Sequence, residues 1–271
     1  MINAIATWKG SAFGIGLTTT VDVSLEVANR THIEAMSDEG TDCTLMVRCV
    51  QLVLARFGLF CKGAVSSKSN IPIAKGLKSS SAVANATVVA TLRALGRELP
   101  SEEIVRLGVR AALDTGVSIT GAYDDACASF FGGVVLTDNR RMILFKREVL
   151  DAEVMIYVPS ESQLTSGVNV GRCRLIAPFV EEAYKLAVNG AYDRAMTLNG
   201  LLYCAALGYD TDVVMDALRC GASGCGLSGT GPAYIALFRD DRDGMDVLDG
   251  LWRARGATVI RTRVTNLGVE V

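Results

Sequence analysis

The spacing of apolar and polar side chains predicts a chain that mixes helices and strands. Residues 21–27 alternate apolar and polar positions with the period of two that a half-exposed strand requires. Over residues 45–57 apolar side chains recur at helical spacing, after a candidate cap at Thr41-Asp42 and before a stop at Gly58. By the same criteria we expect further helices at 80–95, 101–115, 161–169, 178–189, 191–208, 211–219 and 243–255. We expect strands at 2–8, 12–36, 59–66, 154–158 and 233–238, a turn into a strand at 130–136, and a segment at 257–271 that ends in a strand.

The order of these elements favours an α+β fold, because strands and helices are mixed without the strict alternation that a parallel sheet requires. A chain of 271 residues is long enough for one large domain or two small ones. Asp138-Asn139 suits a hairpin turn, and we place a break shortly after it, near residue 150. We therefore predict two α+β domains, residues 1–150 and residues 151–271.

Composition excludes several classes of protein. Half of the residues are hydrophobic and 21% are charged, which excludes an intrinsically disordered chain. A net charge of −2 argues against nucleic acid as the main partner, since a phosphate backbone favours a basic face. The longest uncharged stretch, residues 220–238, contains several glycines and Pro232, so it predicts a loop and a strand rather than a membrane span. With no basic leader after Met1, these features predict a cytoplasmic globular protein.

Histidine and cysteine limit the possible chemistry further. The single histidine, His32, excludes a metal site that needs two imidazoles and makes any Ser-His-Asp site depend on that residue. The eight cysteines include no Cys-x-x-Cys pair and lie in apolar surroundings, as Cys204 does. We interpret them as reduced thiols of a cytosolic protein rather than as a disulfide framework.

The first candidate for chemistry is the segment 72–82 (PIAKGLKSSSA), which follows a predicted strand and opens a predicted helix. Gly76 permits an unusual dihedral angle or the close approach of a ligand. Residues 79–81 are serines placed where the N–H groups of a helix start are unpaired, so amides, hydroxyls and the positive helix end together favour an anion. A serine run that only caps the helix is the alternative interpretation.

The second candidate is the Gly-rich segment 221–231. Residues 224–229 (GCGLSG) match the dinucleotide-binding fingerprint, but a predicted helix precedes them and Pro232 and a strand follow, which is the wrong context. A Walker loop is excluded because the chain contains no Gly-Lys dipeptide. The segment is better interpreted as a loop whose backbone lies against a ligand or another loop.

The third candidate is the acid pair Asp124-Asp125 in the apolar, glycine-flanked segment 120–133. Buried carboxylates are costly unless they meet a cation or a catalytic task. We expect the pair on a loop before Gly132-Gly133. A capped turn with exposed acids would explain the same residues.

Together, and in this order, the three segments resemble the GHMP family of small-molecule kinases. Residues 72–82 match the family's Pro-x-x-x-Gly-Leu-Gly-Ser-Ser-Ala phosphate loop except at Lys78, which replaces the second glycine. Residues 6–9 match the family's early Ala-Pro-Gly-Lys segment at its two ends. Residues 223–238 match its late Gly-rich loop and the strand that follows.

Within that family, the chain is similar to homoserine kinases and, more closely, to the archaeal type of shikimate kinase. Asp124-Asp125 and Gly132-Gly133 align without gaps on the Asp-Asn…Gly-Gly element of homoserine kinases. Lys78 is what the archaeal subgroup has at its position. Four segments are similar to that subgroup: 76–82 (GLKSSSA), 124–129 (DDACAS), 199–204 (NGLLYC) and 228–232 (SGTGP).

The resemblance implies two α+β lobes with ATP and substrate in the cleft between them. It implies transfer of the γ-phosphoryl group of ATP to the 3-hydroxyl of shikimate, in aromatic amino-acid biosynthesis, with Mg²⁺ as cofactor. Asp124 would orient or deprotonate that hydroxyl, with Asp125 as the alternative, and Lys9 would neutralise the transferring group. Ser80 and Asp114 would hold Mg²⁺, and the Asp114 carboxylate is expected to converge with that of Asp124 on the cleft, with Mg²⁺ or Lys9 between them.

Both glycine-containing loops are expected to contact ATP, through Pro72, Ile73, Ala74, Lys75, Gly76, Leu77, Lys78, Ser79, Ser80, Ser81, Ala82, Gly229 and Gly231. Shikimate is an anion, so a cation is expected at its carboxylate, from Lys9, Arg48, Arg172 or Arg174. Two alternatives stay open. One is another GHMP kinase, acting on homoserine, pantoate or a mevalonate-type alcohol, and the other is a non-catalytic nucleotide-binding relative. We make no prediction for the oligomeric state.

Overall fold

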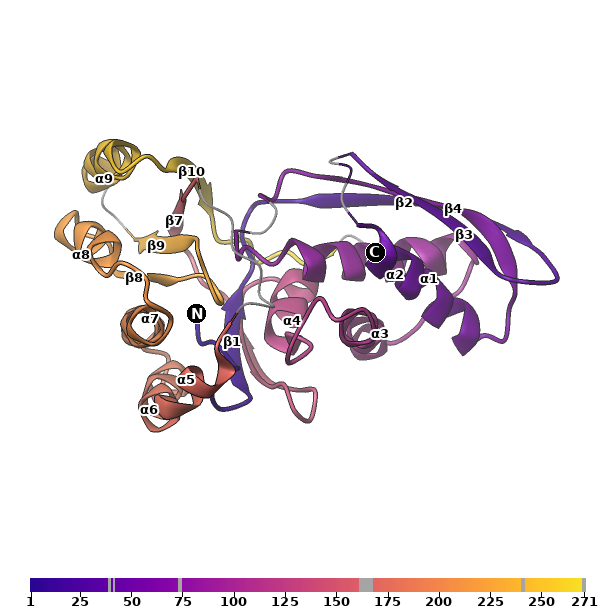
Figure 1. The fold of residues 1–271 in the computed structure, drawn as a ribbon, viewed down its shortest axis with the longest axis horizontal. Coiled ribbons are helices and arrows are strands. Elements are labelled where there is room, and N and C mark those ends of the chain that lie inside the picture. The colour runs from indigo at the N-terminus through magenta and orange to yellow at the C-terminus, as the bar shows by residue number, and fades with distance from the viewer. Residues whose placement is uncertain (39, 41, 73–74, 161–167, 240–241, 270–271) are drawn as a thin grey trace.

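Three β-sheets form the frame of the structure: two take their strands from residues 9–148 and the third from residues 153–263 (Figure 1). The computed structural model describes residues 1–38, 40, 42–72, 75–160, 168–239 and 242–269. Two three-stranded sheets, ordered β1-β5-β6 and β2-β4-β3, contain β1 (Lys9–Phe13), β2 (Thr19–Val27), β3 (His32–Ser37), β4 (Cys61–Ser69), β5 (Val134–Asp138) and β6 (Ile143–Glu148). The four-stranded sheet, ordered β10-β7-β9-β8, contains β7 (Glu153–Val158), β8 (Gly224–Leu227), β9 (Tyr234–Phe238) and β10 (Thr258–Arg263).

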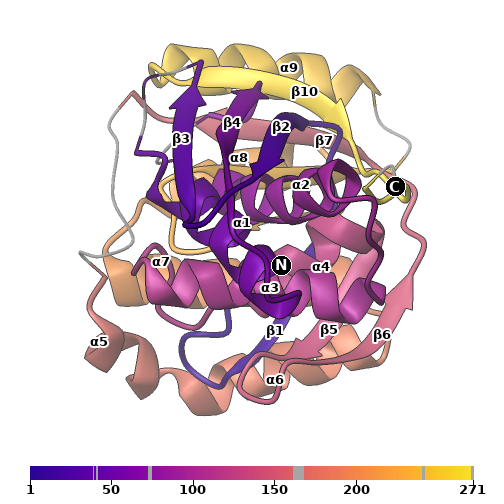
Figure 2. The same cartoon turned by 90° about the vertical axis from the view of Figure 1, so that its right-hand side faces the viewer.

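The helices group with the sheets into two lobes, with β1 between them (Figure 1). The first lobe carries α1 (Thr44–Arg56), α2 (Ser79–Ala94), α3 (Ser101–Asp114) and α4 (Tyr123–Phe131). The second carries α5 (Val170–Leu175), α6 (Ala177–Val188), α7 (Tyr192–Leu207), α8 (Asp212–Arg219) and α9 (Arg242–Ala254). Turning the molecule shows α9 and β10 at one end of the second lobe and α5 and α6 at the other (Figure 2).

The alternating pattern of β2 explains how its sheet is covered. Val21, Val23 and Leu25 point to one face, where they pack against buried side chains of α1 such as Val50 and Leu54. The polar residues between them face away from that core, as the period of two requires. The sheet therefore buries one face only, and the expected α+β architecture is confirmed.

The largest hydrophobic core joins the two lobes. It includes Val134 and Leu136 of β5 together with Ile156 of β7 and Leu237 of β9, all almost fully buried. After β10 the chain returns to the first lobe, where Thr265 N donates to Gly14 O at 3.0 Å. Every strand of the four-stranded sheet follows residue 151, but the domain boundary near 150 stays a prediction.

Most of the helices expected from periodicity are present, and each boundary lies within one residue of its prediction for α1, α2, α3, α6, α7, α8 and α9. Asp42 accepts the Thr44 N–H at 2.9 Å, whereas Thr41 lies outside the described residues. Residues 161–167 of the helix expected at 161–169 also lie outside them, and α5 starts only at Val170. Within the described part of the chain no disulfide joins any of the eight cysteines, in agreement with the prediction of reduced thiols.

Three predictions of local structure are wrong. Residues 2–8 form a turn, in which Trp8 N donates to Ala4 O at 2.7 Å, rather than a strand. The acid pair lies in the first turn of α4 rather than on a loop, because the helix starts directly after Ala122, in left-handed conformation, and acids favour a helix start. The buried strand β8 was expected to be a loop, since its glycines hide the apolar pattern.

Candidate active site

The phosphate loop predicted from the sequence leads directly into α2. Lys78 is the N-cap residue, with left-handed backbone angles of φ 62° and ψ 38°. A lysine side chain has no acceptor, so no side chain at the N-cap occupies the first N–H groups of α2. Upstream, Lys75 Nζ donates to the carbonyls of Pro159 and Ser160, each at 2.8 Å. Ile73 and Ala74 lie outside the described residues.

The Gly-rich loop packs directly on the phosphate loop. Ser228 Oγ donates to Gly76 O at 2.9 Å, and Ala233 N donates to Lys75 O at 3.0 Å. Gly76 has a φ of +82°, and a Cβ added to it would lie 2.5 Å from the carbonyl oxygen of Gly231. Of the two partners expected for the Gly-rich loop, a ligand or another loop, the structure therefore shows the second.

A lysine and an aspartate form a half-buried ion pair between these loops and α4. Lys78 Nζ lies 3.1 Å from Asp125 Oδ2, and the two side chains are 27% and 18% exposed. The lysine side chain runs over Gly229, where an added Cβ would lie 2.5 Å from its Cε atom. Burial disfavours the ammonium, but the carboxylates of Asp125 and Asp124 outweigh it and raise the pKa of Lys78 above its ordinary value.

Asp124 lies behind this ion pair in a buried polar network. Its Oδ1 accepts a hydrogen bond from Asn139 Nδ2 at 2.7 Å, and its side chain packs so closely on Gly10 that an added Cβ there would lie 2.5 Å from Oδ2. Thr137 Oγ1 in turn donates to Asn139 Oδ1 at 2.7 Å. Burial first, and then the Asp125 carboxylate, raise the pKa of Asp124 from 3.8 to about 6.

Two cavities meet at the ion pair. The larger has a volume of about 650 Å³ and is lined by β2, α2 and the segment after β10. The smaller, of about 30 Å³, is lined by Asp124 and polar groups that include Asn3 and Asn199. Lys78 and Asp125 line both cavities, so molecules held in the two cavities would meet at these side chains.

Comparison with known proteins supports the resemblance that the motifs indicate. Residues 44–133 match the model described as GHMP kinases N terminal domain, and residues 183–258 match that described as GHMP kinases C terminal. A curated shikimate kinase of Methanosarcina mazei is 54% identical to this chain, over 99% of the chain and 92% of the relative. The chain belongs to the GHMP kinase family. A shikimate kinase of Halobacterium salinarum is 41% identical to this GHMP kinase, over 100% of the chain and 95% of the relative.

Solved structures support the fold of this GHMP kinase. The mevalonate kinase of Methanococcus jannaschii has a TM-score of 0.75 at 16% identity, over 94% of this chain and 91% of that one. The homoserine kinase of Cytophaga hutchinsonii has a TM-score of 0.70 at 18% identity, over 95% of this chain and 96% of that one. None of the helices built from the described residues is long and apolar enough to cross a membrane.

The structure does not bring two of the expected residues to the acid pair. Lys9 forms an ion pair with Glu181 of α6, and its ammonium lies 5.7 Å from the centre of the Tyr184 ring. Asp114 ends α3, as expected, but its carboxylate accepts from Arg48 at 2.7 Å and from Arg110 at 2.8 Å. Lys9 was expected between the carboxylates of Asp114 and Asp124, but it pairs with Glu181 instead, and the ammonium beside the acid pair is that of Lys78.

The arginines expected to meet a substrate carboxylate have other positions. Arg48 is engaged by Asp114, and Arg172 Nη2 donates to the Ala205 carbonyl at 3.3 Å. Arg174 is exposed on α5. Among the described residues, Lys78 provides the cationic side chain that lines the smaller cavity.

Several residues of the site carried no sequence signal. Asn3 Nδ2 donates to Gly229 O at 2.8 Å, and its main-chain N–H donates to Asn199 Oδ1 at 3.3 Å. Asn139 follows Asp124 by fifteen residues and belongs to no motif. Lys78, by contrast, did have a signal: it replaces a glycine of the family loop, and it has the left-handed backbone that glycine adopts readily.

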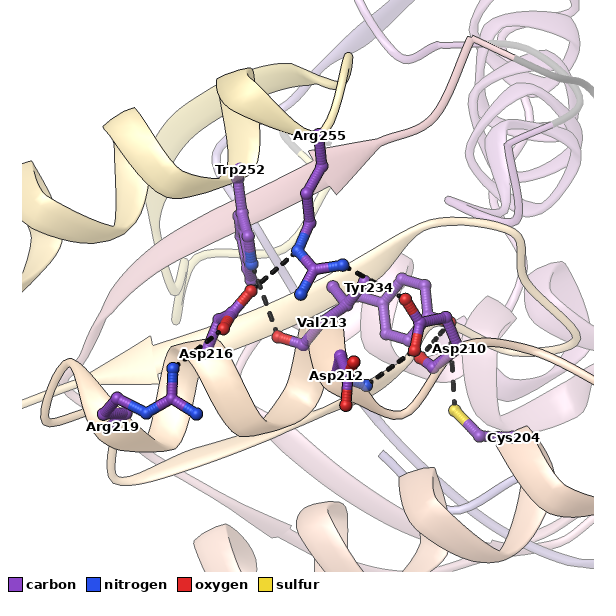
Figure 3. A network of polar contacts seen from close by, with 9 residues as sticks. All are labelled: Cys204, Asp210, Asp212, Val213, Asp216, Arg219, Tyr234, Trp252 and Arg255. Carbon is purple, nitrogen blue, oxygen red and sulfur yellow. Dashed lines mark hydrogen bonds and ion pairs between the residues drawn. The ribbon is translucent and has the colours of Figure 1, made fainter.

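A network in the second lobe supports the Gly-rich loop from behind (Figure 3). Arg255, directly after α9, pairs with Asp216 of α8 at 2.7 Å and with Asp210 at 3.2 Å. The carbonyl of Asp210 accepts from Tyr234 Oη at 2.7 Å. The neighbouring Tyr209 ring occupies the space beside Gly231, where an added Cβ would lie 2.8 Å from its Cζ atom. The loop is thus packed between the phosphate loop and this network.

Proposed function

We propose that this GHMP kinase transfers the γ-phosphoryl group of ATP to the 3-hydroxyl of shikimate. The similarity over nearly the whole chain to archaeal shikimate kinases is the observation that carries the choice of acceptor. The Lys78–Asp125 pair at the meeting point of two cavities supports the class of reaction. Phosphoryl transfer requires alignment of donor and acceptor and compensation of charge, with little covalent work by the protein.

Asp125 is the better placed of the two acids to receive the proton of the attacking hydroxyl. It lines both cavities, whereas Asp124 lines only the smaller one and is 5% exposed. As the hydroxyl oxygen bonds to the γ-phosphorus, its proton passes to the Asp125 carboxylate and the bond from phosphorus to the ADP oxygen breaks. Lys78 pairs with Asp125 and compensates charge on the phosphoryl oxygens, the task expected of Lys9.

The start of α2 supports a phosphate site. Its first turn, Ser79 to Ser81, carries three hydroxyls and the N–H groups of Ser79 and Ser80, and the positive end of the helix favours an anion. The described residues contain no group of three or more His, Cys, Asp or Glu side chains that could hold a metal. Ser80 and the phosphate oxygens of ATP would therefore hold Mg²⁺, a hard cation that takes oxygen ligands, and the ion would compensate phosphate charge. The role of Asp114 as a second ligand stays a prediction without support from this geometry.

The test is a coupled assay of ADP release with ATP and Mg²⁺, using shikimate, homoserine, pantoate and mevalonate in separate reactions. We expect turnover with shikimate alone, and NMR of the product is expected to place the phosphate on the 3-oxygen. Turnover with homoserine, pantoate or mevalonate instead would establish the alternative kinase. ATP binding without turnover of any acceptor would establish a non-catalytic relative.

Asp125→Asn separates the roles of the two acids. Removing a general base lowers kcat by about 10²–10⁴-fold with little change in KM, because the base acts mainly in the transition state. Asp124→Asn is expected to lower kcat less. Wild-type turnover in Asp125→Asn would contradict the assignment of the base.

The cytoplasmic location expected from the sequence stays a prediction.

A further inference from the structure

Asn139 is a buried residue next to the reaction centre that none of the motifs contains. It follows β5 in the hairpin to β6 and is 2% exposed. Its main-chain N–H donates to Trp8 O at 2.8 Å, and its Oδ1 accepts from Thr137 Oγ1 at 2.7 Å. Side chain and main chain are therefore both anchored on the β1-β5-β6 sheet, which packs against both lobes.

The Asn139 amide holds Asp124 at two points. Its Oδ1 accepts the main-chain N–H of Asp124 at 3.2 Å, and its Nδ2 donates to Asp124 Oδ1 at 2.7 Å. A main-chain N–H is always a donor, so the orientation of the amide is fixed by the first contact and the second is a donation to the carboxylate. Asp124 and Asp125 both lie in the first turn of α4, so these two hydrogen bonds fix the position of the turn that carries Asp125.

We propose that Asn139 is a positioning residue for phosphoryl transfer, which holds the first turn of α4 so that Asp125 meets Lys78 and the acceptor hydroxyl. The inference rests on the proposed function and adds a residue outside its motifs. Asn139 acts through Asp124 and does not touch the reacting atoms. A misplacement of about 1 Å in a reacting group can cost roughly 10²-fold in rate. The hydrogen bonds that fix the first turn of α4 therefore have a measurable effect on kcat.

The hydrogen bond from Asn139 also favours the ionised form of Asp124, against its burial and the nearby Asp125. Charged and titratable groups near Asp124 come from several elements: Asp125, Lys78, Cys127, Tyr203 and the amino group of Met1. Asn139→Leu removes the donor and leaves this carboxylate without its amide partner. Asn139→Asp keeps the acceptor for the Asp124 N–H but places a second carboxyl group against Asp124 Oδ1.

The two variants therefore predict different dependences on pH. In Asn139→Asp the two carboxyl groups share a proton at low pH, which restores the hydrogen bond, and lose it as pH rises, because like charges at this distance repel. The ratio of variant to wild-type kcat is expected to be near one at pH 6 and to fall by about 10- to 100-fold towards pH 9. Asn139→Leu is expected to lose about the same factor at every pH, with the KM for ATP nearly unchanged.

Asn85→Leu is the matched control. Asn85 is a fully buried amide of α2 that donates to Ala126 O at 2.9 Å, so it holds the same turn of α4 without touching a carboxylate. The ratio of its kcat to the wild-type kcat is expected to be independent of pH. The assay is the ADP-release assay with shikimate between pH 6 and pH 9, and circular dichroism at each pH measures the folded fraction.

A constant ratio in Asn139→Asp, or wild-type kcat in a folded Asn139→Leu, would overturn the inference. If Asn139→Leu does not fold, the pH dependence of Asn139→Asp decides alone. Asp125→Asn is measured in the same series. If Asp125→Asn retains wild-type turnover, the proposed base is wrong whatever the Asn139 variants show. If Asp125→Asn is inactive while both Asn139 variants have wild-type kcat at every pH, the positioning role of Asn139 is wrong and the proposed function stands.

Discussion

At the scale of single residues, the environment separates two adjacent carboxylates into different roles. Asp125 faces the Lys78 ammonium and both cavities, while Asp124 is buried and bonded to an amide. Adjacent residues on a helix point about 100° apart, so one turn of α4 can present one acid to the reactants and the other to the interior. The difference in surroundings gives the two acids separate functions.

Asp124→Asn is expected to change how stability depends on pH. The pKa of Asp124 is raised from 3.8 to about 6 in the folded protein. As pH rises between these values, the carboxyl group ionises in the unfolded chain before it does so in the folded protein, and the free energy of unfolding of the wild type falls by up to about 3 kcal/mol. Asparagine carries no charge and keeps an oxygen for Asn139. Urea unfolding at pH 4 and pH 7 is therefore expected to show a gain in the free energy of unfolding, relative to wild type, that grows with pH.

Asp114→Asn supplies a control of opposite sign. Hydrogen bonds from Arg48, and the charges of Arg48 and Arg110, lower the pKa of Asp114 below its ordinary value. Its contribution to stability is therefore present at neutral pH and is lost as pH falls through that lowered pKa. The free energy of unfolding that the variant loses relative to wild type is therefore expected to be larger at pH 7 than at pH 3. The same trend with pH in both variants would contradict the assigned environments.

At the scale of elements, two loops and one helix start depend on one another. The phosphate loop is held against the Gly-rich loop by Ser228, and the side chain of its last residue, Lys78, crosses Gly229 to reach α4. Gly229 has a φ of +58°, and the space above it is filled by that lysine. The glycine is therefore needed both for its backbone angle and for the path of the side chain.

Gly229→Ala tests this arrangement against Gly96→Ala. Gly96 has a similar φ of +61° and nothing within 4 Å of an added Cβ, so both variants cost about 1 kcal/mol of stability for the left-handed backbone. Only Gly229→Ala displaces Lys78 from Asp125, and we expect it to lower kcat by about tenfold or more. Steady-state kinetics and thermal unfolding measure the two effects. Equal kcat in both variants would show that the path of Lys78 is unimportant.

At the scale of the whole molecule, the segment after β10 ties the second lobe back to the first. Asn266 Oδ1 accepts from Leu150 N and its Nδ2 donates to Leu150 O, each at 3.0 Å. Val269 N donates to Phe130 O at 2.9 Å, at the end of α4. These contacts, together with a core that includes strands of both halves, indicate that the two lobes unfold together.

Asn266→Ala is expected to lower the stability of both lobes at once. It removes two hydrogen bonds and leaves two main-chain groups without partners, at a cost of about 1–3 kcal/mol. For a chain of this size the Tm falls by about 2–4 °C per kcal/mol. Calorimetry is expected to show one shifted transition, whereas Leu267→Ala, an 83% exposed neighbour, changes little. Two separate transitions would show that the lobes unfold independently.

The sequence by itself determined the features that depend on neighbours along the chain. Apolar periodicity gave the amphipathic helices, because a helix face repeats within a few residues. The glycine and serine spacing of residues 72–82, the acid pair and the late Gly-rich loop, taken in order, were sufficient to predict the family and its α+β fold. Within α4 local pattern failed, because small residues and flanking glycines are as typical of a loop as of a buried helix.

Only the tertiary structure decided which side chains meet in the site. Lys78 and Asp125 are separated by 47 positions and Gly76 and Ser228 by 152, and no local spacing encodes such contacts. Lys9 and Lys78 are equally charged in the sequence, but the packing of α6 places Glu181 beside the first and the start of α4 places Asp125 beside the second. Asn139 reaches Asp124 because the β5–β6 hairpin ends against α4. Contacts between distant segments depend on how the buried surfaces pack, and that packing is a property of the whole fold.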